Sequence, residues 1–241
     1  MFKQTLIAAA LLAAGYANAA VPVTLTQWNF NSLVADASTS TGSTLASTGS
    51  GVASLLGGMT ATFASGDAGT GSSDPATGDD SGWNLSTFAA QSAGNLTRGA
   101  QFKMSTVGYQ DVVFTYDLRH SNTSAMSETV QYSLDGSNFV TGAQFSGNAG
   151  DTWFKGRTLN LTTITGANNN ANLTFRVLAS FAPSTSLYAA SSPTGTYGTT
   201  GTWRFDMVTA SAVAAVPEPE TYAMLMAGLG LIGLVRRRRQ A

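Results

Sequence analysis

Apolar and polar residues alternate with a period of two through much of the chain between residues 23 and 210. In the segment 111–119, one face would carry Val112, Phe114, Tyr116 and Leu118, and the other Val113, Thr115, Asp117 and Arg119. Successive side chains of a strand point to opposite sides of a sheet, so this alternation predicts half-buried β-strands. No long stretch before residue 222 shows the 3.6-residue period of a helix.

The same pattern predicts strands at 23–30, 59–65, 101–106, 111–119, 129–134, 153–161, 173–179 and 202–210, and a return strand beginning at 139–140. Loops rich in Ser, Thr, Gly or Asp are predicted at 36–58 and 66–82. Seven or eight strands with loop-rich connections are typical of an all-β domain built as a β-sandwich.

Two local features sharpen this prediction. Asp135-Gly136 lies between alternating segments and predicts a two-residue type I′ turn, because both residue types tolerate positive φ. In the last strand, Trp203, Phe205 and Met207 are expected on one face.

The two ends of the chain break the pattern. Lys3, an apolar run and the small-residue sequence Ala17-Asn18-Ala19 predict a cleaved signal peptide. Near the C-terminus, the 222–235 run is apolar and would reach about 21 Å as a helix, short of the ~30 Å hydrocarbon core, although flanking arginines can snorkel. The predicted division is a signal peptide (1–20), a β-sandwich ectodomain (21–211), a linker (212–221), a transmembrane helix (222–235) and a basic cytoplasmic tail (236–241).

The C-terminal segment combines three parts in a fixed order. Val216, Pro217, Glu218 and Pro219 come first, an apolar run follows, and Arg236, Arg237, Arg238 and Arg239 close the segment. This arrangement resembles the PEP-CTERM sorting signal of Gram-negative bacteria. The resemblance implies transient anchoring in the inner membrane, processing near 217–219 by an exosortase, and export to the cell surface or to the exopolysaccharide matrix of a biofilm. A plain tail anchor is the alternative interpretation.

The domain between the two ends also carries a family resemblance. An opening Trp28-Asn29-Phe30, a hairpin from Tyr132 to Phe139 and a closing Trp203-Arg204-Phe205-Asp206 resemble the jelly-roll ectodomains that are common among PEP-CTERM proteins. Similar folds serve as carbohydrate-binding modules, but a fold does not settle a function.

Charge and composition exclude several classes of protein. Residues 21–215 hold seven basic and eleven acidic side chains, a net charge of −4, and no basic stripe, so nucleic acid is not an expected partner. The chain has no cysteine and a single histidine, His120. Disulfides, thiol catalysis and sites with two histidines are therefore excluded.

Acidic residues gather in the predicted 66–82 loop. Asp67, Asp74, Asp79 and Asp80 are candidate calcium ligands, because calcium prefers several carboxylate and carbonyl oxygens. Their spacing does not match an EF-hand, and a solvated acidic loop is the alternative. A separate calcium between the first and last strands, using Asp206, is a second hypothesis.

Aromatic residues near loops are candidate sugar contacts. Trp83 and Tyr109 are the main candidates, and Tyr188 and Tyr197 lie in similar positions; packing within the loops is the alternative. Asp117 and His120 could form an acid–base pair, but no nucleophile motif accompanies them, and a strand-end salt bridge is the simpler interpretation.

The sequence thus favours an exported, exosortase-sorted surface or matrix protein without catalytic activity. The alternatives are a carbohydrate-binding module or a secreted polysaccharide-active enzyme. Glu128 is the single glutamate of the ectodomain, which weakens the enzyme hypothesis.

Overall fold

The computed structural model describes residues 21–68, 70–76, 78–215, 226 and 229. Alternating side chains form extended strands, joined by loops that are rich in small and polar residues. The strands are β1 (Val23–Trp28), β2 (Thr48–Gly49), β3 (Gly51–Leu56), β4 (Thr60–Ser65), β5 (Ser81–Ser86), β6 (Gly99–Met104), β7 (Tyr109–His120), β8 (Ser127–Ser133), β9 (Val140–Ser146), β10 (Thr152–Asn160), β11 (Leu173–Ser180) and β12 (Trp203–Ala214). A single turn of 3₁₀ helix, η1 (Thr165–Ala167), precedes β11.

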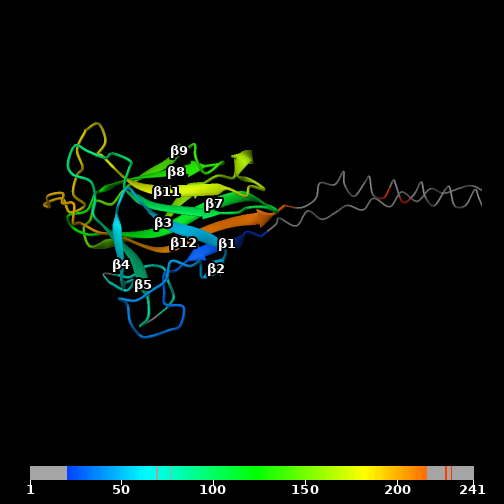
Figure 1. Cartoon of the computed structure of the whole chain (residues 1–241), viewed down its shortest axis with the longest axis horizontal. Coiled ribbons are helices and arrows are strands. Elements are labelled where there is room, and N and C mark those ends of the chain that lie inside the picture. The colour runs from blue at the N-terminus through cyan, green and yellow to red at the C-terminus, as the bar shows by residue number, and fades with distance from the viewer. Residues whose placement is uncertain (1–20, 69, 77, 216–225, 227–228, 230–241) are drawn as a thin grey trace, which may run out of the picture.

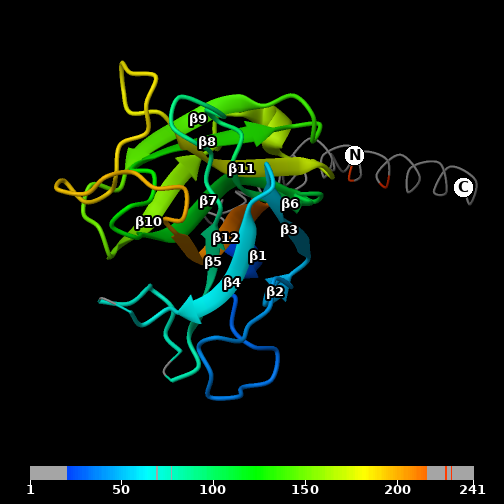
Figure 2. The same cartoon turned by 60° about the vertical axis from the view of Figure 1, so that its left-hand side comes forward.

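Two antiparallel sheets pack face to face (Figures 1 and 2). Sheet A has the order β10-β7-β12-β1-β2, and β5 also pairs with β12 and carries β4 on its other edge. Sheet B has the order β3-β6-β11-β8-β9. The predicted all-β sandwich is therefore confirmed.

Aromatic side chains fill the space between the sheets. Phe114 of β7 stacks on Phe175 of β11, with ring centroids 4.2 Å apart and planes 9° from parallel. Phe205 of β12 meets Phe102 of β6 edge-on at 5.9 Å. All buried members of this core cluster lie between Trp28 and Ala212. Every core residue that the structure describes thus lies within residues 21–215, and these residues hold a hydrophobic core of their own.

The structure corrects the predicted loops in three places. The segment 36–58 contains β2 and β3, whose Ser, Thr and Gly content concealed them. The 66–82 segment ends inside β5, so Trp83 belongs to a strand. The β8–β9 connection is longer than a two-residue turn: Gly136 has φ +79°, while the Asp135 carboxylate accepts the N–H groups of Ser137 and Asn138, both at 2.8 Å.

The last strand also differs from its predicted form. Met207 has φ +45° and interrupts the alternation, so Val208 and Ala210 take the buried positions after Phe205. The predicted shared face of Trp203, Phe205 and Met207 is therefore wrong at Met207. The strand also continues to Ala214, past the predicted domain end at 211.

The predicted signal peptide, the PEP segment and the basic tail lie outside the described residues, as does nearly all of the predicted transmembrane helix. Among the residues that the structure does describe, no helix is long and apolar enough to span a membrane.

Candidate functional site

One edge of β12 changes its partner strand within a few residues. Phe205 pairs with Trp83 of β5, whereas Val208 pairs with Trp28 of β1. Between them the register of β12 against β7 shifts, at the positive-φ Met207. Bulges of this kind bend a strand and re-aim its side chains. Asp206 therefore lies at the point where β5 and β1 separate.

Three aspartates meet at this point. Asp80 immediately precedes β5, Asp74 lies earlier in the β4–β5 connection, and Asp206 belongs to β12. One carboxylate oxygen from each lies within 4.8 Å of the other two. Asn31, which follows β1, donates from Nδ2 to Asp74 Oδ2 at 3.0 Å and accepts the Ser81 N–H at 2.8 Å. The cluster thus joins segments from both ends of the domain.

Two of these carboxylates are buried, and each has one oxygen without a hydrogen-bond partner among the described residues. Asp80 is 1% exposed and Asp206 is 0% exposed. Asp80 Oδ1 and Asp206 Oδ2 have no hydrogen-bond partner within the described residues, although Asp206 Oδ1 accepts the Met207 N–H at 2.7 Å. Burial, reinforced by the neighbouring negative charges, raises the pKa of Asp80 to about 7 and that of Asp206 to about 9.

The β4–β5 connection is held against the outer face of sheet A. Asp117 of β7, 2% exposed, accepts the Ser73 N–H at 2.6 Å and the Gly156 N–H at 2.8 Å. The Trp153 indole donates to the Ala68 carbonyl at 2.8 Å. These contacts explain how a segment without regular structure reaches Asp206.

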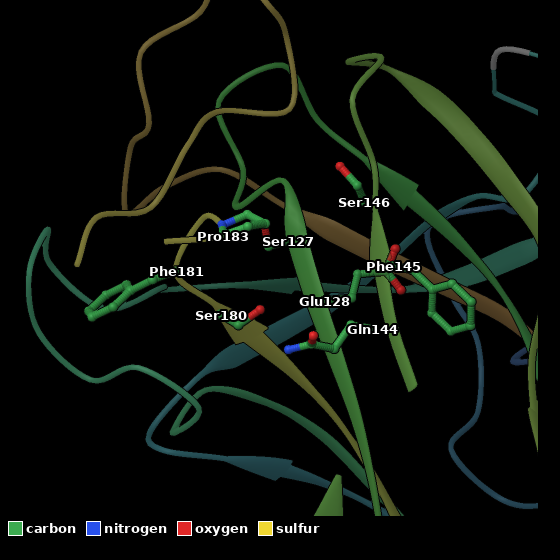
Figure 3. Close-up of a pocket in the computed structure, with 8 residues that line it drawn as sticks. All are labelled: Ser127, Glu128, Gln144, Phe145, Ser146, Ser180, Phe181 and Pro183. Carbon is green, nitrogen blue, oxygen red and sulfur yellow. The ribbon is translucent and has the colours of Figure 1, made fainter. Parts of the chain in front are cut away.

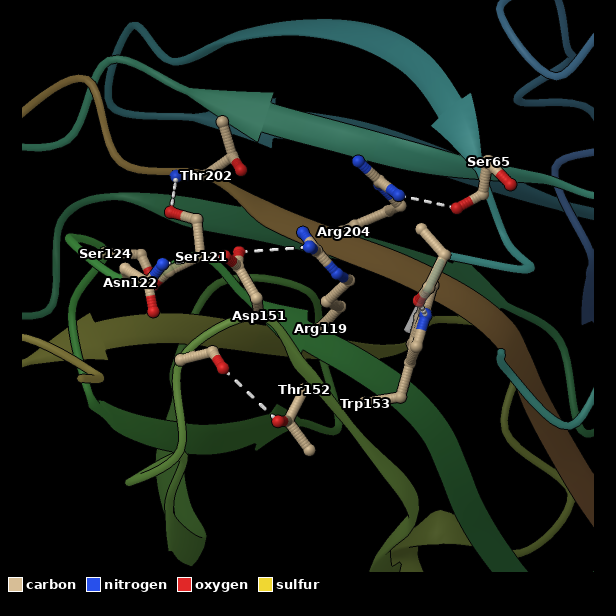
Figure 4. A network of polar contacts seen from close by, with 12 residues as sticks. Ser65, Arg119, Ser121, Asn122, Ser124, Asp151, Thr152, Trp153, Thr202 and Arg204 are labelled. Carbon is tan, nitrogen blue, oxygen red and sulfur yellow. Dashed lines mark hydrogen bonds and ion pairs between the residues drawn. The ribbon is translucent and has the colours of Figure 1, made fainter. Parts of the chain in front are cut away.

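Two arginines extend this face beyond the aspartates (Figure 4). Arg119 and Arg204 are register partners on β7 and β12, next to the register pair Asp117 and Asp206. Arg119 forms an ion pair with Asp151 at 3.0 Å, and Arg204 donates to the Ser65 carbonyl at 2.5 Å. Burial, followed by the charge of Arg119, lowers the pKa of Arg204 to about 10. Both guanidinium groups are thus directed to partners other than the aspartate cluster.

The four predicted calcium ligands divide into two groups. Asp74 and Asp80 belong to the cluster, as does Asp206 from the second calcium hypothesis. Asp79 instead accepts the N–H groups of Asp36 and Ser38, at 3.3 and 3.2 Å. Asp67 is exposed. Sequence spacing could not separate these roles, because the β12 bulge decides which carboxylates converge.

His120 has a different partner from the one considered in the sequence. Its Nε2 lies 3.0 Å from Glu128 Oε1, and Tyr116 donates to the other Glu128 oxygen at 2.6 Å. Arg157 completes the group at 3.2 Å from Glu128. The Glu128 side chain is fully buried, and burial together with Glu128 raises the pKa of Tyr116. The acid–base pair of Asp117 and His120 does not form.

A hollow of about 270 Å³ lies at the end of sheet B beneath the loop that follows β11 (Figure 3). Its lining comes from β8, β9, the end of β11 and the loop that follows it, and consists of Ser127, Glu128, Gln144, Phe145, Ser146, Ser180, Phe181 and Pro183. Glu128 is the lone carboxylate in this lining, and its own oxygens are bound to Tyr116, His120 and Arg157.

A polar row crosses the outer face of sheet B, three to four residues along the strands from this hollow. Its members are in register on five neighbouring strands: Ser54, Gln101, Arg176, Gln131 and Thr141. Arg176 donates to Gln101 Oε1 at 2.8 Å, and its guanidinium carbon lies 3.4 Å from the centroid of the Phe139 ring. The alternation of β11 indicated the outward position of Arg176, but one sequence cannot show which residues flank it on other strands.

The aromatic residues proposed as sugar contacts occupy other places. Trp83 is 4% exposed and stacks on Phe30 at 5.5 Å, so neither ring face is open to a sugar, and that expectation is wrong. Tyr188 and Tyr197 stack on each other at 4.7 Å, as the loop-packing alternative has it. Tyr109 begins β7 and is half-buried against the core, and its sugar contact stays a prediction.

The sandwich and the C-terminal tail resemble different known proteins. The sandwich is similar to the N-terminal CBM22-1 and GH10 modules of endo-1,4-beta-D-xylanase 10B from Clostridium thermocellum, with 14% identity and a TM-score of 0.44 over 69% of this chain and 27% of that chain. It is also similar to a CBM22-1 xylan-binding domain from Paenibacillus barcinonensis, with 11% identity and a TM-score of 0.39 over 68% of this chain and 87% of that chain. The K1 adhesin domain of Lys-gingipain from Porphyromonas gingivalis is similar with 12% identity and a TM-score of 0.36, over 70% of this chain and 100% of that chain. No curated protein gives a significant match.

The class of protein defined so far is an all-β sandwich joined to a C-terminal sorting segment. Residues 215–239 match the family model described as the PEP-CTERM protein-sorting motif. The chain therefore carries a PEP-CTERM motif, which marks an exported protein that an exosortase processes and sorts to the surface.

Proposed function

We propose that this protein is a non-catalytic component of the cell surface or exopolysaccharide matrix, and that it contacts polysaccharide through the outer face of sheet B. The observation that carries this proposal is the in-register polar row from Ser54 to Thr141. Four strand spacings make the row about 19 Å long, which suits several consecutive sugars of a linear chain lying across the strands.

The chemistry of the row fits sugar hydroxyls. Gln101 and Gln131 each offer an amide donor and acceptor, and Arg176 offers further donors between them. The Phe139 ring covers Arg176 and fixes the plane of its guanidinium group. Such a surface binds by several hydrogen bonds made at once, so the loss of its central member should weaken the whole contact.

The hollow at the end of sheet B supports binding without hydrolysis. Glycoside hydrolysis normally uses two carboxyl groups on opposite sides of the scissile bond. The described lining contains only Glu128, whose side chain is fully buried and already paired. A polysaccharide end or branch could fit this space without meeting an available pair of acids.

Affinity electrophoresis of the 21–215 domain, in gels containing exopolysaccharide extracted from the producing strain, tests the proposal. Retardation of the native domain is expected, and Arg176→Ala should reduce affinity about tenfold, as expected for a lost charge-assisted hydrogen bond. Lys155→Ala removes an exposed cation from sheet A and serves as the matched control. Unaltered retardation of Arg176→Ala would show that the polysaccharide contact does not use the polar row. New reducing ends in the polysaccharide would show that the protein hydrolyses it.

The processing step has a separate test. The prolines of Pro217-Glu218-Pro219 fix φ and remove backbone donors, which suits recognition as an extended segment. Replacing these three residues by Ala should leave export intact and block release of the domain, while Glu220→Ala should be processed normally. Mass spectrometry of the mature C-terminus gives the readout. If residues 222–239 are still attached to the native surface protein in a strain with an active exosortase, the processing prediction is wrong and the segment is a plain tail anchor.

A further inference from the structure

The buried aspartate cluster is a separate feature, and the proposed function does not use it. Asp74, Asp80 and Asp206 place three carboxylate oxygens within 4.8 Å of one another. Two of these side chains are at most 1% exposed, and Asp80 Oδ1 and Asp206 Oδ2 are buried without a partner in the described part of the chain. Buried carboxylates are normally paired with a cation or held by hydrogen bonds, so these free oxygens need an explanation.

Basic side chains do not supply that explanation. Ion pairs among the described residues involve Asp151 and Glu128, and the cluster takes part in none of them. Arg204, on the same face, is directed to the Ser65 carbonyl and to Asn84. A bound cation would supply the positive charge that these buried carboxylates lack.

We propose that Asp74, Asp80 and Asp206 bind a calcium ion that fastens the β4–β5 connection to β12. Calcium takes six to eight oxygen ligands at about 2.3–2.6 Å, so ligands of one ion lie no more than about 5 Å apart, and these three oxygens lie within that limit. Magnesium requires about 2.0–2.1 Å and a near-ideal octahedron and usually keeps several waters, so a set of three protein carboxylates suits it less well. The all-carboxylate set also lacks the nitrogen and sulfur ligands that softer metals favour.

The position of the ion defines its role. Asp74 and Asp80 bracket the second half of the β4–β5 connection, and Asn31 links Asp74 to the segment after β1. Gly66 packs directly against the Asp80 carboxylate, leaving no room there for a side chain. The ion therefore ties the segments that follow β1 and β4 to the last strand, in a domain that has no cysteine for a disulfide.

Calcium binding is tested on the 21–215 domain after treatment with chelator and dialysis. Thermal unfolding is followed with added CaCl₂ or MgCl₂, and retained metal is measured by elemental mass spectrometry. Calcium at one hundred times its Kd should raise Tm by about 5–10 °C, because a ligand specific to the native state stabilises it by mass action. A Kd near 10⁻⁴–10⁻³ M is expected from other extracellular calcium modules, with a weaker response to magnesium.

Asparagine substitutions keep the side-chain shape and separate binding from folding. Asp80→Asn and Asp206→Asn should fold without calcium, because each keeps the shape of a buried side chain without its ionisable group, yet both should lose the rise in Tm. Asp79→Asn is the matched control from the same connection and should keep the full response. A Tm of the native domain that stays constant up to about 10 mM calcium, about ten times the upper end of that Kd range, overturns the proposal. So does a response that survives in Asp206→Asn, or an equal response to magnesium.

Discussion

The outer faces of the two sheets arise from the same alternation of residues, but they differ in charge and in whether a loop covers them. On sheet A, Asp117 and Asp206 are at most 2% exposed and lie beneath the β4–β5 connection. On sheet B, Gln101, Gln131 and Arg176 remain half-buried in a row that reaches from one edge strand to the other. One face binds a segment of its own chain, and the other presents hydrogen-bonding groups outward.

This difference shows that polar residues in outward positions can have two roles, one in holding a loop and one in presenting groups to solvent. Carboxylates that accept backbone N–H groups replace the hydrogen-bond partners that an irregular segment lacks. Amides on a sheet surface are satisfied by water until another polar molecule displaces it. Substitutions on sheet A should therefore change stability, and substitutions on sheet B should change binding.

The largest effect is expected at Asp117. Asp117→Ala leaves the N–H groups of Ser73 and Gly156 without their charged acceptor, and should lower the free energy of unfolding by about 3 kcal/mol. Urea denaturation of the 21–215 domain measures this loss. Asp117→Asn keeps one acceptor oxygen and should cost clearly less. A loss below about 1 kcal/mol for Asp117→Ala would mean that the connection is held by other contacts.

A smaller and more local effect is expected at Trp153. Trp153→Phe removes the hydrogen bond to the Ala68 carbonyl and should cost about 1 kcal/mol. Amide hydrogen exchange should increase within residues 66–80 while the strands of sheet B keep their protection. Lys155→Ala removes an exposed contact to Thr70 from the same strand and should change little. Exchange that rises evenly over both sheets would contradict a local role.

The smallest effect on stability is expected at Gln131. Gln131→Ala removes an outward amide and should change the free energy of unfolding by no more than about 0.5 kcal/mol, while retardation by exopolysaccharide falls. Denaturation and affinity electrophoresis on one preparation provide both readouts. A stability loss near 2 kcal/mol with unchanged retardation would show that the row is structural, and would remove the contrast between the faces.

The strands with strong alternation could be predicted from sequence, and those without it could not. Segments such as 111–119 carry large apolar residues at every second position, so burial alone identifies them. β3 has the sequence Gly51-Val-Ala-Ser-Leu-Leu56, and its weak pattern becomes a strand only through pairing with β6. Trp83 looked like a loop residue because the preceding Gly- and Asp-rich segment gave no sign of where β5 begins.

The candidate sites show a similar limit. Asp74 and Asp80 could be named as candidates because calcium chemistry needs carboxylates, and Asp206 because it lies on the last strand. Their convergence depends on the bulge at Met207 and on the exchange of β5 for β1 beside β12. The polar row on sheet B depends on the register of five strands. Both depend on pairing between strands that are distant in the sequence, which a local pattern of residues does not determine.

The central position of β12 has a mechanical consequence. The strand pairs with β7 on one edge and with β1 and β5 on the other, and Ala212, near its C-terminal end, pairs with Val23. Tension applied through the residues after Ala215 would run along this strand and strain the ladders on both edges together. Many hydrogen bonds would then have to yield at once rather than one after another as in peeling an edge strand. A sandwich pulled from this end would therefore resist in shear along its central strand.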